Sequence, residues 1–254
     1  MYIVAIDNLG EDREGVARAL SEALGMTFYD ALVRVRVPGK GPLIVAAYKE
    51  KNTAIEKAEK LGAAGFRTLV LGHDEIETDK MRIIIRKFFF GDSELKIEAR
   101  TGETVRIEYA LVDMIIHGTK IVQNTETETV KGRKFDASRA ILSGGLITTK
   151  SVKITQQRTT EVREGFIHLY LRNQRPLVFL ESALLYDSLG PALQLTRAAN
   201  FAVVLAELRR RCPGAVYDDR LVSRAGQSRL LGPMFEPERH LDIAVSLLSR
   251  SLRS

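Results

Sequence analysis

Residues 144–151, GGLITTKS, come close to a phosphate-binding loop, whose pattern is Gly, four residues, then Gly-Lys-Ser/Thr. Gly144, Lys150 and Ser151 are in register, but Thr149 stands where the second Gly belongs. That Gly lets the backbone approach the phosphate, and a working loop opens a helix. The following stretch, SVKITQQRTT, is instead rich in β-branched residues, which favour a strand. The pattern therefore predicts a hairpin or loop tip and no nucleotide site.

Other residues that could do chemistry are scattered. No two histidines have the spacing of two to five residues typical of metal ligands, since they stand at His73, His117, His168 and His240. His168 lies in FIHLYL, a strand pattern in which it could face either side. Cys212 follows three arginines, whose charge could lower a thiol pKa, but no base is identifiable nearby and we expect it to pack. We predict no catalytic residue, metal or cofactor, and we do not expect an enzyme.

Positive charge is concentrated in one segment. Residues 119–175 carry eleven basic and five acidic side chains, a net charge of +6 that equals the net charge of the whole chain. Within it, residues 119–160 are rich in Thr and contain a KGRK cluster. A long segment of this kind is either a solvated insertion or a functional surface. In the second interpretation, the residues that contact an anionic partner are Lys131, Arg133, Lys134, Arg139, Lys150, Lys153 and Arg158.

Three classes of partner remain open for this surface. Another protein is the expected partner, and nucleic acid and an anionic membrane surface are the alternatives. Recognition of single-stranded nucleic acid uses aromatic residues that stack on bases, and only Phe135 stands among the basic residues. Binding to a duplex backbone needs only the positive charge.

Length, cysteine content and hydropathy indicate the number of domains, the compartment and whether the chain spans a membrane. A chain of 254 residues exceeds a typical single domain, so we expect two. One cysteine permits no intramolecular disulfide, which fits a reducing cytosol. The start of the chain lacks a signal-peptide pattern, and apolar runs such as FAVVLAEL are far shorter than the roughly 20 residues that span a bilayer. We expect a cytoplasmic protein without a transmembrane segment.

The first seventy residues predict a small α/β domain. Strands are expected at 2–6, 42–48 and 67–72, and helices over 11–25, over FYDALVRV and over AIEKAEKLGAAGF. Gly25 suits the end of the first helix, Thr27 suits the N-cap of the second, and Asn52 or Thr53 suits the N-cap of the third. This β-α-α-β-α-β order resembles the C-terminal domain of the bacterial ribosomal stalk protein.

That resemblance covers residues 1–72 and concerns the fold alone. The stalk domain binds translation factors through a helix pair that opens with a Gly-Leu-Gly-Leu-Lys-type segment. The matching stretch here is Gly25-Met26-Thr27-Phe28-Tyr29-Asp30, which lacks the second Gly and the lysine. Binding of translation factors is therefore not expected to carry over.

The rest of the chain predicts short strands followed by helices. Strands are expected at 83–90, 93–99, 104–112 and 114–118, and then at KITQQRT, GFIHLYLR and PLVFLE. Helices are expected over 197–213 and along the tail, where Leu241, Ala244, Leu248 and Leu252 form one stripe. This order resembles a pleckstrin-homology-type barrel of the kind found in bacterial proteins, a fold that takes lipid, peptide or protein ligands.

Together these patterns predict an α+β protein. We expect a small β-α-α-β-α-β sandwich at residues 1–76 and an antiparallel, barrel-like β domain with C-terminal helices at 77–254. The predicted function is a non-enzymatic binding or adaptor protein that uses the basic surface around 119–160, and a nucleic-acid-associated protein held by phosphate contacts is the alternative.

Overall fold

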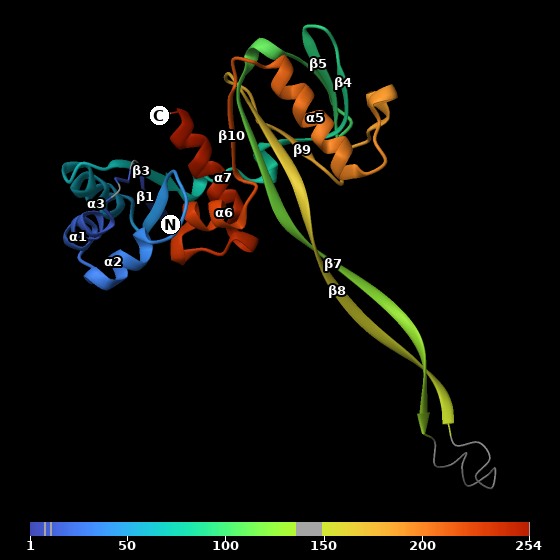
Figure 1. The fold of residues 1–254 in the computed structure, drawn as a ribbon, viewed down its shortest axis with the longest axis horizontal. Coiled ribbons are helices and arrows are strands. Elements are labelled where there is room, and N and C mark those ends of the chain that lie inside the picture. Colours follow the sequence, from blue (N-terminus) through green and yellow to red (C-terminus); the bar gives the residue numbers. More distant parts are fainter. Residues whose placement is uncertain (8, 11, 136–148, 254) are drawn as a thin grey trace. The chain divides into compact units, whose positions relative to one another are not determined.

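The computed structural model describes residues 1–7, 9–10, 12–135 and 149–253, with the backbone alone described for 123–135 and 149–160. Two sheets and several helices make up these residues, and the C-terminal part is helical (Figure 1). The predicted α+β class is confirmed.

The N-terminal part forms a three-stranded antiparallel sheet with three helices. In chain order its elements are β1 (Tyr2–Asp7), α1 (Arg13–Leu24), α2 (Phe28–Val35), β2 (Leu43–Tyr48), α3 (Lys51–Ala63) and β3 (Arg67–Gly72). The strand order is β2-β1-β3, so β1 is central and pairs with both neighbours. This is the predicted β-α-α-β-α-β order.

Local capping residues set the helix ends in this part. The Thr27 side chain accepts a hydrogen bond from the Asp30 backbone N–H, as predicted for the N-cap of α2. Gly25 ends α1 with φ of +70°, a left-handed conformation that glycine adopts without strain. The start of α3 was predicted wrongly. That helix begins at Lys51, and its N-cap position is held by Glu50, whose side chain makes no capping bond.

A seven-stranded sheet follows in the order β10-β7-β8-β9-β4-β5-β6. Its strands are β4 (Ile83–Phe90), β5 (Glu94–Ala99), β6 (Thr104–Glu108), β7 (Val112–Phe135), β8 (Thr149–Leu171), β9 (Leu177–Leu180) and β10 (Val216–Leu221). The pairs β4–β5, β5–β6 and β8–β9 are antiparallel, whereas β4–β9 and β7–β10 are parallel. The sheet is therefore mixed, because strands separated by long connections can pair in parallel.

The α-helices that accompany the seven-stranded sheet lie mainly near the C-terminal end of the sequence. They are α5 (Arg197–Arg211), α6 (Arg224–Leu231) and α7 (Pro237–Arg253). Short 3₁₀ helices lie at η1 (His73–Glu75), η2 (Asp79–Met81), η3 (Tyr109–Leu111), η4 (Asp187–Ala192) and η5 (Gly232–Met234). Within the described ranges, no helix combines the length and the apolar character that a membrane span requires.

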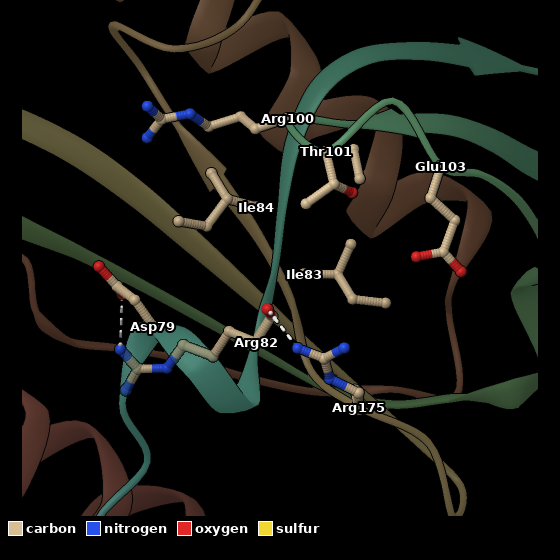
Figure 2. Close-up of a pocket in the computed structure, with 9 residues that line it drawn as sticks. Asp79, Arg82, Ile83, Ile84, Arg100, Thr101, Glu103 and Arg175 are labelled. Atoms are coloured by element: carbon tan, nitrogen blue, oxygen red, sulfur yellow. Dashed lines mark hydrogen bonds and ion pairs between the residues drawn. The ribbon is translucent and has the colours of Figure 1, made fainter.

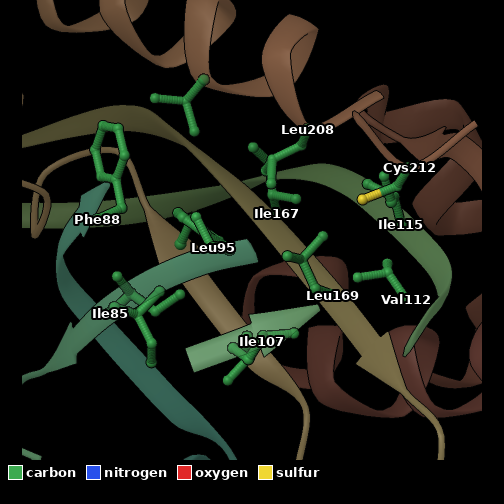
Figure 3. Packing of buried hydrophobic residues seen from close by; sticks show 14 of the residues in the cluster. Ile85, Phe88, Leu95, Ile107, Val112, Ile115, Ile167, Leu169, Leu208 and Cys212 are labelled. Atoms are coloured by element: carbon green, nitrogen blue, oxygen red, sulfur yellow. The ribbon is translucent and has the colours of Figure 1, made fainter. Parts of the chain in front are cut away.

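Three apolar clusters form the core of the part of the chain whose side chains are described. The first joins the seven-stranded sheet to α5 and includes Ile167 and Leu169 of β8 and Leu208 of α5 (Figure 3). The second joins both sheets to α6 and α7, and the third packs the small sheet on α1, α2 and α3. Alternate residues of β1 enter different clusters: Val4 and Ile6 face the three helices, and Ile3 and Ala5 face the second cluster. The small sheet is therefore buried on both faces.

Contacts divide the chain into two compact units, one of residues 1–120 with 164–254 and the other of residues 121–163. This division groups residues by contact, and the predicted domains at 1–76 and 77–254 stay a prediction.

Candidate functional site

Six of the seven basic residues singled out in the sequence lie on long strands. Lys131, Arg133 and Lys134 are on β7, and Lys150, Lys153 and Arg158 are on β8. Arg139 lies outside the described residues, and the structure describes only the backbone of the other six. The strands β7 and β8 are hydrogen-bonded neighbours in the sheet.

In unit 121–163 the two strands have open outer edges. The other neighbour of β7 is β10, which pairs with it between Met114 and Gly118. The other neighbour of β8 is β9, which pairs with it between Phe166 and Leu169. Within the described residues, no third strand therefore pairs with 121–135 or 149–163. Open edges expose backbone N–H and C=O groups that another molecule can bind.

The phosphate-binding loop is excluded by its surroundings. Such a loop must be followed by a helix, but Thr149, Lys150 and Ser151 begin strand β8. Gly144 lies outside the described residues. The predicted strand after the motif is confirmed.

Buried polar residues line one face of β8. Glu164, His168 and Tyr170 alternate along the strand, and each is less than 10% exposed. Ser182 donates from its backbone N–H to Glu164, whose carboxylate also pairs with Lys120 at 3.1 Å. The Tyr170 hydroxyl donates to Glu77 at 2.9 Å. This row was missed in the sequence, where FIHLYL resembles an apolar strand.

His168 is neutral in this environment. Burial lowers its pKa well below 6.5, and the charges of Arg82 and Lys120 lower it further. Its Nδ1 atom has no hydrogen-bond partner, and its ring lies beside those of Phe166 and Tyr170. An uncharged histidine enclosed by rings and cations is suited to packing rather than to proton transfer at neutral pH.

Arg82 is a buried cation held by three carboxylates. Its side chain is 3% exposed, and its Nη1 atom lies 2.6 Å from Asp242 and 3.5 Å from Asp79. The 3.8 Å separation from Nε to Glu77 is too long for a hydrogen bond and leaves an ion pair only. A buried arginine of this kind joins the segment before β4 to α7.

A pocket of about 280 Å³ lies beside Arg82 (Figure 2). Arg175 donates to the carbonyl of Arg82 at 3.0 Å and to that of Lys80 at 2.8 Å. Arg100 and Glu103, from the turn between β5 and β6, also line it. The unpartnered Nε and Nη2 atoms of Arg82 are closed to solvent, so a ligand in this pocket cannot reach them.

A second pocket, of about 360 Å³, lies along α7. It is lined by Leu71, Glu75, Glu77, Ser246, Ser249, Arg250 and Arg253. Its charged groups come from two regions, the segment after β3 and the last turns of α7. This convergence of acidic and basic groups has no signal in the sequence, because about 170 residues separate the two regions.

Cys212 lies in the first apolar cluster, at the end of α5 (Figure 3). Burial raises the pKa of its thiol to about 11 and outweighs the nearby positive charge of Arg211. The arginines therefore do not activate it. Within the part of the chain that the structure describes, no three His, Cys, Asp or Glu residues are grouped to hold a metal ion.

Comparison with known proteins gives no match. No family model, no curated protein and no solved structure matches the chain.

Proposed function

We propose that the chain is a non-enzymatic binding protein that contacts an anionic macromolecule through unit 121–163. The observation that carries this proposal is a separate unit of two paired strands whose sequence is basic. It has eight Lys and Arg against four Asp and Glu, a net charge of +4. Such a charge attracts acidic surfaces over roughly 8–10 Å in physiological salt.

The partner of first choice is another protein, which makes the chain an adaptor. The open edges of β7 and β8 support this choice, because an extended segment of a partner can add to a strand edge by main-chain hydrogen bonds. A second copy of the same unit is disfavoured as the added strand, since two units of +4 repel each other.

Duplex nucleic acid is the second candidate, and the pairing of the strands favours it. A two-stranded ribbon fits the major groove of a duplex, and phosphate contacts need only lysine and arginine. In this case affinity falls with salt, by a slope of about 0.9 in log K against log salt for each phosphate neutralised.

One experiment tests the proposal. The full chain and the variant Lys131→Glu/Arg133→Glu/Lys134→Glu are used as baits in a lysate, with and without nuclease. A matched control, Lys40→Glu/Lys49→Glu/Lys51→Glu, makes the same change in charge at exposed lysines of the other unit. We expect a stoichiometric protein that survives nuclease, is retained by the control and is lost with the first variant.

Other outcomes separate the alternatives. Nucleic acid that copurifies only without nuclease, and is lost with the first variant, would replace the adaptor by the duplex-binding function. If both variants retain the partner equally, the basic residues of unit 121–163 do not bind it, and the proposal is overturned.

A further inference from the structure

The pocket along α7 holds two opposite charges that contact the same tyrosine without contacting each other. Tyr170 donates its hydroxyl to Oε2 of Glu77 at 2.9 Å. The guanidinium carbon of Arg253 lies 4.6 Å from the centroid of the Tyr170 ring. No ion pair joins Glu77 to Arg253 among the described residues, although both line the pocket.

Glu77 is fixed before any ligand arrives. Its Oε2 atom takes the Tyr170 bond and lies 3.8 Å from Nε of Arg82, and its backbone N–H donates to Oγ of Ser246 at 2.9 Å. Burial, and then the neighbouring Glu77 carboxylate, raise the pKa of Tyr170, so its hydroxyl stays protonated and donates. In the described part of the chain, Oε1 of Glu77 accepts no hydrogen bond. This oxygen therefore has lone pairs for an incoming donor.

Arg253 is held in a different way. Its guanidinium lies over the aromatic face of Tyr170, a cation–π contact, and it pairs with no carboxylate of the described residues. Its N–H groups are therefore available for a carboxylate, which arginine binds with two parallel hydrogen bonds. Tyr170 thus positions both an anion and a cation in one pocket.

The other charges in the pocket decide which ligands fit. Glu75 accepts from the Gly72 N–H at 2.7 Å and pairs with Arg250 at 2.6 Å, so this second pair is internally neutral. A ligand with only a negative charge would meet the carboxylate of Glu77, and one with only a positive charge would meet the guanidinium of Arg253. A ligand that carries both signs meets an opposite charge at each end.

We propose that this pocket binds a small zwitterion of the α-amino acid type. Its ammonium group donates to Oε1 of Glu77, and its carboxylate accepts from Arg253. The volume of about 360 Å³ lies near the lower end of ligand pockets, which run from roughly 300 to 1,000 Å³, and suits a molecule of this size. This site is independent of the basic unit 121–163.

Calorimetric titration of the full chain tests the site. The probes are the standard amino acids, one at a time, with acetate and methylammonium as ligands of a single charge. We expect at least one amino acid to bind at millimolar concentration or below, and neither single-charge ligand to bind comparably. Arg253→Gln should weaken affinity about tenfold or more, because a charged hydrogen bond is lost.

Two further variants are measured, one as a control and one as a second test of the site. Arg239→Gln changes an exposed arginine on the same helix that pairs with Glu236, and should leave affinity unchanged. Glu77→Gln should also weaken binding, but it removes a partner of the buried Arg82, so its fold is checked by circular dichroism first. Arg253 is exposed, so we expect Arg253→Gln to fold, and circular dichroism checks this as well.

Three results would overturn the proposal. The first is that no amino acid gives heat of binding, even at ten times millimolar concentration. The second is that Arg253→Gln binds the amino acid with the same affinity as the unsubstituted protein. The third is that acetate binds as tightly as the best amino acid.

Discussion

At the scale of single residues, the interior of this protein contains charges and polar groups that a purely apolar core would exclude. Arg82 and Glu164 are ion-paired, but His168 keeps a ring nitrogen without a partner. Desolvation of such a group favours its neutral form. The protonation state of His168 therefore couples the stability of the fold to pH.

The sign of this coupling follows from the direction of the pKa shift. The pKa of His168 in the fold lies well below the unfolded value of about 6.5. Below about pH 6.5 the unfolded chain takes up a proton that the folded chain does not, so stability falls as pH falls. As the pH is lowered from 6.5 towards the pKa of His168 in the fold, the free energy of unfolding of the unsubstituted protein should fall relative to that of His168→Gln. The fall should be up to about 1.4 kcal/mol for each pH unit.

Urea unfolding of both proteins at several pH values between 7.5 and 5 measures this difference. His73→Gln, at an exposed position, is the control. If the stability difference between the full chain and His168→Gln does not change with pH, His168 is not the group that couples stability to acid.

At the scale of elements, α2 shows how one side chain sets a helix end. Thr27 accepts from the Asp30 N–H at 3.1 Å, and its hydroxyl donates to the Asp30 carboxylate at 2.7 Å. Thr27→Ala removes both bonds and should lower the free energy of unfolding by about 1 kcal/mol. Thr27→Ser keeps the hydroxyl and should recover most of that loss. Chemical denaturation of the three proteins measures it, and equal losses in both variants would contradict the capping role.

The same element explains why the N-terminal part could be predicted. Thr27 and Gly25 act within a few residues of themselves, so their roles are visible in a short window of sequence. The α3 start was missed because Asn52 and Thr53 are good capping residues, yet they lie inside the helix. Local preference there gives way to the packing of Ala54, Ala58 and Leu61 in the third cluster.

Elements that depend on distant partners could not be predicted. Strand β10, VYDDRL, shows no apolar alternation, and it forms because it pairs in parallel with β7 about a hundred residues earlier. Residues 121–135 have polar Thr-Glu alternation with no apolar face, so they resembled an insertion although their backbone is strand. The convergence of Glu77, Tyr170 and Arg253 depends on tertiary packing in the same way.

At the scale of the whole molecule, unit 121–163 should be removable. The pairings of β7 with β10 and of β8 with β9 lie outside it. Lys120 and Glu164, which flank the unit on the neighbouring strands β7 and β8, form an ion pair, with Nζ of Lys120 3.1 Å from Oε2 of Glu164. A two-residue Asn-Gly turn that joins Lys120 to Glu164 suits a hairpin of this kind. We expect the shortened protein to keep its fold and its amino-acid site, and to lose the anionic macromolecular partner.

For the shortened protein, thermal unfolding tests the fold, calorimetry tests the amino-acid site, and its use as bait in the lysate tests the macromolecular partner. A loss of cooperative unfolding would show that unit 121–163 contributes to the stability of the remainder. Retention of the macromolecular partner by a folded, shortened protein would contradict the proposed function.

The burial of the small sheet on both faces has a consequence for synthesis. Ile3 and Ala5 pack in the second cluster with residues of α7, and the Ser251 hydroxyl donates to Asp7 at 2.6 Å. One face of β1 therefore stays uncovered until α7, more than two hundred residues later in the sequence, has been synthesised. At about 5–20 residues per second this wait lasts on the order of ten seconds or more. During that time the nascent chain presents an apolar sheet face, which is the kind of surface that chaperones hold.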